Sequence, residues 1–283
     1  MIPNLRMMFP GGFGLFAVAV MALPSPALAG EFVADQGFYR VYQNDHLLGI
    51  ERVSFEQHGD SLVLISTVRQ RLPRGMGQQD TLAKTGMLVL GLRDHALRSY
   101  QSYEQLNGDN LTRILSVDDT VYTSYRQSSE GGFGDTYALP PGRAYVVDPQ
   151  VFALFDGLCR DLHAQHFDER TVSMIYIMAR DTTVTARVKR LGTEPFKLGA
   201  QTVSAEKFSI TDPLSQFFAW VSPSGRMLRL TLPVVGLRVE RDPESLKPKS
   251  SMKSALPSAP GLPTVTMGPT PKPSQEPVAP PGR

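Results

Sequence analysis

The side chains best suited to chemistry in this sequence are two histidines and two carboxylates near its middle. His163 and His166 are three positions apart, so on a helix they would share one face, and Asp168 and Glu169 follow. Two histidines and a carboxylate could hold a metal ion. The segment lacks the H-E-x-x-H motif, however, and the dipole of a helix also stabilises a histidine at its C-terminal end. We therefore predict a solvated helix end, with no metal and no cofactor.

Cys159 is the only cysteine, which excludes a disulfide within the chain. It precedes His163 by one helical turn, as in a thiol–imidazole pair. Catalytic pairs of this kind usually come from separate elements, and the thiol must be exposed in electropositive surroundings. Because Phe155 and Leu158 precede Cys159 in an apolar run, we expect it to pack as a small hydrophobic residue. A reactive thiol and an intermolecular disulfide are the alternatives.

Two further enzyme motifs are incomplete or missing from the sequence. Gly131-Gly132-Phe133-Gly134 has the glycine content of a phosphate-binding loop, but no Lys-Ser or Lys-Thr pair follows it. We expect a flexible hairpin loop at these residues. The G-x-S-x-G motif of many serine hydrolases does not occur. The sequence therefore indicates no catalytic residue.

Aromatic side chains give the remaining lead to a site. Phe218 and Trp220 share one face of an expected strand, Tyr100 lies on another strand, and Phe152 and Phe155 lie on an expected helix. A curled sheet beneath a helix can enclose an apolar cavity, which these five residues would line. We predict them as ligand-binding residues. The alternative is that they fill the core, as a single tryptophan in a β-domain often does.

The elements that would position these side chains are mainly β-strands. Apolar and polar residues alternate with a period of two, and the turn pairs Asn44-Asp45, Asn107-Gly108 and Asp118-Asp119 stand at the joints. Strands that follow one another through short polar turns predict an antiparallel meander. The expected strands cover residues 38–43, 48–55, 61–71, 81–90, 96–105, 111–117, 120–126, 171–178, 182–191, 202–210, 217–221, 226–232 and 237–241.

One substantial helix is expected, from Asp148 to Gln165. Apolar residues recur at helical spacing through this segment, with Asp148 suited to the N-cap and Pro149 to the first helical position. Gly157 within it costs about 1 kcal/mol relative to alanine. The predicted fold class is therefore mainly β: an antiparallel meander curled into a half-open barrel, with one helix at about 148–165 packed over it.

Residues 1–29 have the pattern of a secretory signal peptide. Arg6 precedes an apolar run at residues 13–23, and Ala27-Leu28-Ala29 supplies the small residues of a cleavage site before Gly30. The run is shorter than the roughly 20 residues that a membrane-spanning helix needs, and an uncleaved anchor is the alternative. No cysteine follows the site to carry a lipid. We expect an exported protein of the periplasm or cell envelope that is soluble after cleavage.

The last part of the chain differs sharply in composition. Eleven of the 23 prolines lie in residues 243–283, and no aromatic residue does. Such a segment cannot bury enough apolar surface to fold, so we predict a disordered tail after a β-rich domain at residues 30–242. The tail and Arg6 carry an excess of positive charge, and the domain between them is slightly acidic. We therefore expect no binding of nucleic acid.

Two short motifs resemble those of a known group of proteins. An N-terminal strand that ends in Tyr42–Gly49 resembles the opening Y-x-V-x-x-x-G-x-x-x-G pattern of exported bacterial β-proteins of unknown function. Trp220–Arg226 resembles their W-x-x-x-x-G-R/K hairpin. Those proteins are similar to the periplasmic lipoprotein-carrier fold, an antiparallel sheet curled into a half-open barrel. The resemblance implies this fold class and the binding of apolar ligands, and it implies no catalytic residue.

These patterns favour a non-enzymatic envelope protein that binds a lipid or another hydrophobic or amphipathic molecule. The alternative is a structural or scaffolding protein whose Pro-rich tail contacts an envelope protein or the cell wall. A hydrolase with an unrecognised site is the third interpretation. An enclosed apolar cavity larger than roughly 300 Å³ would favour the binding protein over the scaffold.

Overall fold

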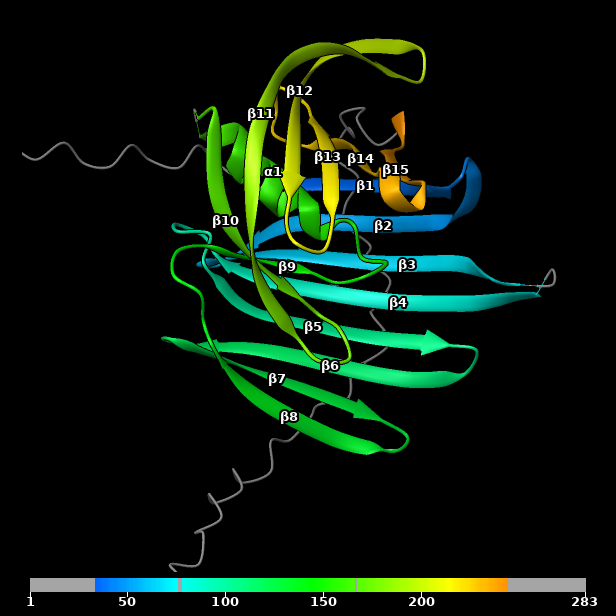
Figure 1. Cartoon of the computed structure of the whole chain (residues 1–283), viewed down its shortest axis with the longest axis vertical. Helices are drawn as coiled ribbons and strands as arrows, with labels where there is room; N and C mark the ends of the chain where they lie inside the picture. The colour runs from blue at the N-terminus through cyan, green and yellow to red at the C-terminus, as the bar shows by residue number, and fades with distance from the viewer. Residues whose placement is uncertain (1–33, 76–77, 166, 244–283) are drawn as a thin grey trace, which may run out of the picture. The chain divides into compact units, whose positions relative to one another are not determined.

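The computed structural model describes residues 34–75, 78–165 and 167–243 (Figure 1). The chain divides into two units, Met1–Leu246 and Lys247–Arg283, and every described residue belongs to the first. The predicted signal peptide and all but the first residue of the predicted tail lie outside the described residues. Within the described ranges, no helix is long and apolar enough to cross a membrane.

Strands account for most of the described chain, which confirms the predicted mainly β class. The part of the chain that the structure describes forms fifteen strands, one α-helix and one short 3₁₀ helix. In chain order they are β1 (Asp35–Gln43), β2 (His46–His58), β3 (Ser61–Gly75), β4 (Gln78–Gly91), β5 (Leu97–Leu106), β6 (Asp109–Asp118), β7 (Val121–Ser128), β8 (Gly131–Ala138), β9 (Ala144–Val147), α1 (Leu154–Ala164), β10 (Glu169–Tyr176), β11 (Thr182–Leu198), β12 (Gln201–Thr211), β13 (Gln216–Val221), β14 (Met227–Leu232), η1 (Pro233–Val235) and β15 (Leu237–Arg241).

The first strand lies inside the sheet and not at its edge. β1 pairs with β2 on one side and with the last strand, β15, on the other, and both pairs are antiparallel. The sheet therefore has two wings that meet where β1 pairs with β15. One wing runs outward from β2 to β8, and the other runs from β14 to β9. Figure 1 shows the sheet curling around α1, which is the open, curled arrangement that the sequence predicts.

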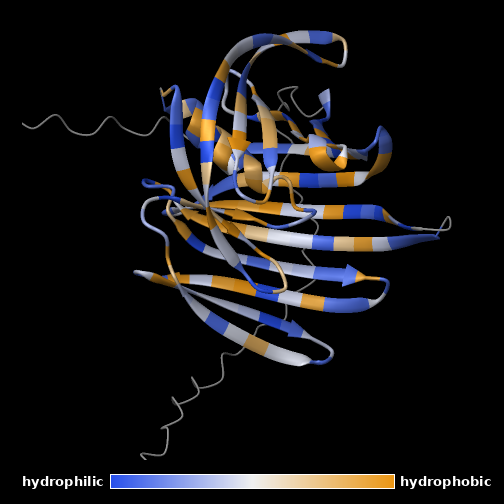
Figure 2. Ribbon diagram, viewed as in Figure 1, coloured by the Kyte–Doolittle hydropathy of each residue, from blue (hydrophilic) through white to orange (hydrophobic). Residues whose placement is uncertain are grey.

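Alternating burial along the strands gives the sheet a solvated face and an inner face that packs against α1. In β1, for example, Tyr39 and Val41 are buried, whereas Phe38 and Arg40 are exposed. Figure 2 shows the same alternation of hydropathy along many strands. This pattern follows from the two-residue period of a strand, so the sequence could reveal it.

Two of the three predicted turn pairs are confirmed as they stand, and the third is shifted by one residue, because Asp118 ends β6 and the turn is formed by Asp119 and Thr120. Asn44 and Asp45 have φ angles of 48° and 64°, and Asn107 and Gly108 have φ angles of 52° and 98°. Two consecutive residues with positive φ form the two-residue hairpin turn that matches the twist of antiparallel strands. Asn, Asp and Gly adopt this conformation more readily than other residues, which is why these turns could be predicted.

Helix α1 confirms the predicted helix, but the prediction of its start was wrong. It begins at Leu154, six residues after Asp148. Asp148 is not its N-cap, because the carboxylate of Asp148 accepts hydrogen bonds from Lys84 and Tyr100 on the sheet. Contacts with distant strands therefore hold residues 148–153 in a non-helical turn, which local sequence patterns cannot show.

Strands β9 and β10 form the one parallel pair among the described strands. Helix α1 connects them, and a helical crossover of this kind lets two successive strands run in the same direction. The prediction of antiparallel pairing is therefore confirmed for every other neighbouring pair of described strands and wrong for this one. The meander is also interrupted between β8 and β9, which lie at opposite edges of the sheet.

Gly131–Gly134 lie in strand β8, so the expected loop at these residues was wrong. The strand pairs with β7 through all eight of its residues. The glycines leave room for the ring of Tyr125 on β7, since a Cβ at Gly132 would lie 2.2 Å from the Tyr125 hydroxyl. Glycine is unfavourable in isolated strands, and a neighbouring aromatic ring here compensates for the missing side chains.

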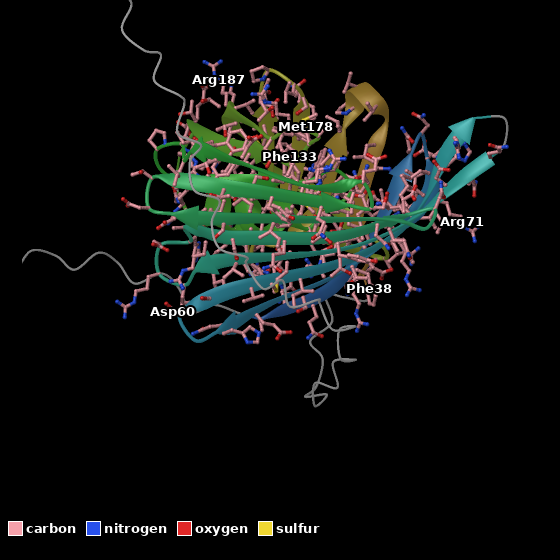
Figure 3. All side chains as sticks on the ribbon, turned by 90° about the horizontal axis from the view of Figure 1, so that it is seen from below. Phe38, Asp60, Arg71, Phe133, Met178 and Arg187 are labelled. Carbon is pink, nitrogen blue, oxygen red and sulfur yellow. The ribbon has the colours of Figure 1, made fainter. Side chains whose placement is uncertain are left out.

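The apolar core consists of two clusters. The main core lies between α1 and the inner face of the sheet, where α1 packs against β9, β13 and β14. A smaller second cluster contains Phe196, Leu198, Ala205, Trp220 and Leu228. Some large apolar side chains are exposed, among them Phe38, Phe133 and Met178 (Figure 3).

Candidate functional site

Three of the five aromatic residues predicted to bind a ligand lie in or against the main core. Tyr100 on β5 is fully buried, and its hydroxyl donates to Asp148 Oδ2 at 2.7 Å. Phe155 on α1 is buried, with its ring centroid 4.9 Å from that of Phe217. Phe152 is partly buried against the same core. These residues therefore fasten α1 and the turn before it to the sheet.

The other two residues, Phe218 and Trp220, belong to the second cluster. The Trp220 Nε1 group donates to Glu194 Oε1 at 2.6 Å, and Lys207 Nζ lies 4.7 Å from the tryptophan ring centroid. The five predicted residues thus lie in two separate clusters. Their role in ligand binding stays a prediction.

Little space remains between α1 and the sheet. A cavity of about 10 Å³ lies there, lined by Leu88, Leu90 and Leu158 among others. This volume is close to the smallest that can hold one water molecule. This cavity is therefore too small for a lipid chain in this conformation.

Buried charged groups hold residues 148–153 against the sheet. Lys84 on β4, with 3% of its side chain exposed, places its Nζ atom 2.5 Å from Asp148 Oδ1 and 2.9 Å from Glu104 Oε2. Asp148 is fully buried, and burial raises the pKa of its carboxyl group while the Lys84 ammonium opposes this shift. The ion pair therefore compensates for burying two charges under the turn.

Glu51 on β2 provides the N-terminal cap that α1 lacks in its own sequence. The backbone N–H groups of Phe152 and Ala153 donate to its carboxylate at 3.0 and 2.9 Å, and the Ser66 hydroxyl donates at 2.6 Å. Burial raises the pKa of Glu51 to about 7, although these three hydrogen bonds favour the ionised form. A carboxylate from a distant strand thus orients the start of the helix.

The raised pKa of Glu51 predicts a pH-dependent stability. Between about pH 4.5 and 7 the folded chain holds a proton that the unfolded chain releases, so the free energy of unfolding falls as pH rises, by about 3 kcal/mol. Asp148, whose pKa is also raised, acts in the same direction. Denaturant unfolding at about pH 5 and pH 8 measures the change.

The control variants for this prediction lie on the same strand. Glu51→Gln should flatten the pH dependence, whereas Glu56→Gln, at a position that solvent reaches, should leave it intact. An equal pH dependence in wild type and Glu51→Gln would contradict the prediction.

A second buried charge cluster surrounds Asp35 at the start of β1. Its carboxylate lies 2.7 Å from Arg241, 3.1 Å from Arg160 and 3.4 Å from Arg226. The Arg241 side chain is fully buried, and its Nη1 atom also donates to the Tyr39 hydroxyl at 3.0 Å. One carboxylate therefore joins β1, β15, α1 and the turn before β14.

These buried charges were not predicted from the sequence. Glu51 and Lys84 occupy positions of the strand alternation at which their neighbours Val53 and Leu82 are buried apolar residues. A charged residue at a strand position whose neighbours on the same face are apolar is therefore the sequence pattern that could have revealed them.

The histidine and cysteine candidates have structural contacts. His163 Nδ1 lies 3.0 Å from Glu206 Oε2, and His166 lies outside the described residues. Cys159 is fully buried, as expected, and burial raises the pKa of its thiol. In the described part of the chain, no three His, Cys, Asp or Glu side chains gather as a metal site requires.

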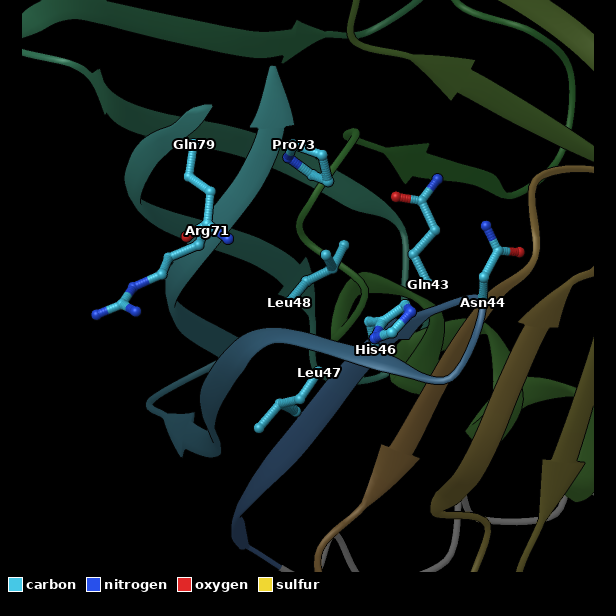
Figure 4. A pocket seen from close by; sticks show the side chains of 8 residues that line it. All are labelled: Gln43, Asn44, His46, Leu47, Leu48, Arg71, Pro73 and Gln79. Atoms are coloured by element: carbon cyan, nitrogen blue, oxygen red, sulfur yellow. The ribbon is translucent and has the colours of Figure 1, made fainter. Parts of the chain in front are cut away.

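An open cleft lies where the β1–β2 turn approaches the ends of β3 and β4 (Figure 4). Its volume is about 440 Å³, within the range of small-molecule sites. Apolar and polar side chains share its lining, and none of the five predicted aromatic residues is among them. The lining residues are Gln43, Asn44, His46, Leu47, Leu48, Arg71, Pro73 and Gln79.

Comparison with known proteins shows the fold alone. No family model matches the sequence, and neither does any curated protein. Among solved structures, the chain is similar to a beta-barrel-like protein of the domain of unknown function DUF1849 from Brucella abortus. The TM-score is 0.51 at 9% sequence identity, over 74% of this chain and 95% of that one. The similarity supports a barrel-like β fold of unknown function, without favouring the lipoprotein-carrier fold in particular.

Proposed function

We propose that this chain is an exported, non-enzymatic protein of the cell envelope that binds an amphipathic ligand in the cleft beside the β1–β2 turn. The cleft is the observation that supports the proposal, because it is open to solvent, has a volume of about 440 Å³ and is lined by both apolar and polar side chains. Leu47, Leu48 and Pro73 offer apolar contacts, while the side-chain amides of Gln43 and Asn44 offer hydrogen-bond donors. This combination suits a molecule with an apolar chain and a polar head.

The buried charges support binding over catalysis. Glu51 and Asp148, whose pKa values the fold raises, are sealed from solvent beneath residues 148–153. A general acid or base must come within hydrogen-bond reach of its substrate, and these two carboxylates cannot do so in this conformation. Their contacts fix the position of α1.

Export and a relationship to the periplasmic lipoprotein carriers belong to the same proposal. The signal-peptide pattern at residues 1–29 supports export, with cleavage before Gly30 leaving a soluble protein. The motifs at Tyr42–Gly49 and Trp220–Arg226, together with the barrel-like fold, support the relationship. The first of these motifs includes five residues of the cleft lining.

Leu47 provides a direct test, because 57% of it is exposed and its loss should leave the core intact. Leu47→Ser is expected to weaken binding of the neutral probe N-phenyl-1-naphthylamine about tenfold, as removal of one leucine contact would. Fluorescence titration measures the affinity. Leu214→Ser, at a leucine with 54% exposure outside the cleft, is the matched control.

The two leucine variants separate the outcomes. Weakening in Leu47→Ser alone supports the cleft, and equal affinities in both variants contradict it. A wild-type protein that does not bind the probe also contradicts it.

The packed core favours a second candidate, a scaffolding protein of the envelope. The cavity between α1 and the sheet measures only about 10 Å³, and the apolar side chains around it belong to the main core. In that case the Pro-rich residues 243–283 would contact an envelope protein or the cell wall. Deleting residues 244–283 should then abolish retention of the protein by isolated envelopes, without changing probe binding.

A further inference from the structure

Two arginines lie directly opposite each other on the inner face of the β2–β8 wing. Arg113 on β6 pairs with Arg126 on β7, and Arg126 pairs in turn with Phe133 on β8. All three side chains share the face of Tyr122, which is buried in the main core four residues before Arg126. They are therefore neighbours on the concave side of the sheet, toward the turn between β7 and β8.

Like charges placed opposite each other destabilise a sheet, so this pair needs a compensating partner. Arg113 donates to the backbone carbonyl oxygen of Met178, which is a neutral acceptor. Within the described residues, neither guanidinium lies within 4.0 Å of a carboxylate oxygen. Both side chains are partly buried, and their repulsion is therefore screened less than at an open surface.

The nearest carboxylates on these strands are engaged elsewhere. Glu104, diagonal to Arg113, is paired with Lys84 at 2.9 Å. Asp135, diagonal to Arg126, accepts a hydrogen bond from the Tyr137 hydroxyl at 3.4 Å. A third carboxylate, the buried Asp181, lies in the turn that Arg113 contacts and accepts a hydrogen bond from the backbone N–H of Met178 at 3.2 Å, but it forms no ion pair with either arginine. Asp181 offsets part of the positive charge, and the arginine pair has no direct anionic partner in the described chain.

Exposed apolar groups flank the two arginines. Phe133 is 51% exposed, and Met178, whose carbonyl group meets Arg113, is 43% exposed. Both are among the residues labelled in Figure 3. The phenyl ring opposite Arg126 and the exposed side chain of Met178, whose backbone meets Arg113, can contact an alkyl chain while the guanidinium groups bind an oxyanion.

We propose that Arg113 and Arg126, with Phe133 and Met178, form a second binding site, which takes the phosphate head and the adjoining alkyl chain of a single-chain anionic amphiphile. Each guanidinium group would donate hydrogen bonds to the phosphate oxygens, and this anion would relieve the repulsion between the arginines. The Lys-rich residues 244–283 have the wrong charge to occupy this site. The site is separate from the cleft, since the two share no residue.

Isothermal titration with dodecyl phosphate, below its micelle concentration, tests the proposal. Dodecyl maltoside has the same chain without the charge, and inorganic phosphate has the charge without the chain. The wild-type protein should bind dodecyl phosphate most tightly. Arg126→Met keeps the length of the side chain but removes its charge, and should weaken this binding about tenfold or more.

Several variants make the test specific. Arg126→Lys should retain most of the affinity, and Phe133→Ala should weaken binding of dodecyl phosphate but not of inorganic phosphate. Arg187→Met, at an exposed arginine of β11 that pairs with Glu169, should change nothing. Leu47→Ser should also leave dodecyl phosphate binding unchanged, so the failure of this site and that of the cleft are distinguishable.

The thermal stability of Arg126→Met gives an independent readout. If the arginine pair serves a ligand, removing one charge relieves repulsion, and the midpoint of unfolding should stay the same or rise. A lower midpoint together with unchanged dodecyl phosphate affinity would show a purely structural role and overturn the proposal. Equal wild-type affinity for dodecyl phosphate and dodecyl maltoside would also overturn it.

Discussion

Replacing Lys84 by methionine is expected to lower the free energy of unfolding by about 3–5 kcal/mol. Methionine has a similar length and no charge, so the change removes the ammonium group with little loss of packing. Asp148, which is fully buried, would lose the cation 2.5 Å from its Oδ1 atom, and Glu104 would lose its partner as well. Denaturant unfolding at neutral pH measures the loss.

A double variant and a surface control separate the charge effect from general damage. Adding Asp148→Asn to Lys84→Met removes the unpaired carboxylate, so it should recover part of the lost stability. Lys189→Met, at an exposed position of β11, should change stability by no more than about 0.5 kcal/mol. The prediction fails if the two lysine variants lose the same small amount.

Replacing Asp35 by alanine should have an effect at least as large, about 3–5 kcal/mol or more. Three arginines lie within 3.4 Å of this carboxylate, and Arg241 is fully buried. Without the anion, buried guanidinium charges would repel one another, and a guanidinium group does not release its proton to escape this cost. Thermal unfolding monitored by circular dichroism gives the result.

The control for Asp35 is an ion pair on the surface. Asp60 contacts Arg98 at 3.0 Å, with 81% and 45% of the two side chains exposed. Solvent screens such a pair, so Asp60→Ala should lower stability far less than Asp35→Ala does. If Asp35→Ala cost no more than Asp60→Ala, the buried cluster would not stabilise the fold as we argue.

The strands and their turns could be predicted because their causes are local. Alternation of apolar residues sets the faces of a strand, and pairs such as Asn44-Asp45 and Asn107-Gly108 adopt positive φ angles readily. The start of α1 could not be predicted, because its position depends on Glu51, a residue about a hundred positions away. Strand β8 was missed because the ring of Tyr125 on the next strand compensates for its glycines.

The candidate sites depend even more on distant parts of the chain. The cleft brings the β1–β2 turn to the ends of β3 and β4, and Arg113 meets Arg126 only through the register of β6 with β7. In the sequence, Arg113 and Arg126 look like ordinary polar residues of a protein surface. The aromatic residues were conspicuous in the sequence, yet Phe155 and Trp220 lie in separate clusters. Their residue types indicated that they would be buried, but the order of the strands in the sheet determined which cluster each residue joined.

The pairing of β1 with β15 also determines when this protein can fold during its synthesis. Tyr39 pairs with Arg241, so β1, the first of the described strands, can complete its pairing only after β15, the last of them, has been synthesised. Closing so long a loop costs conformational entropy before the β1–β15 contacts can offset that cost, and contacts between residues far apart in the sequence make folding slow. Until β15 arrives, both wings keep an unpaired edge that can join other chains. A nascent chain of this protein should therefore remain open, and in need of protection, until almost its last strand has been made.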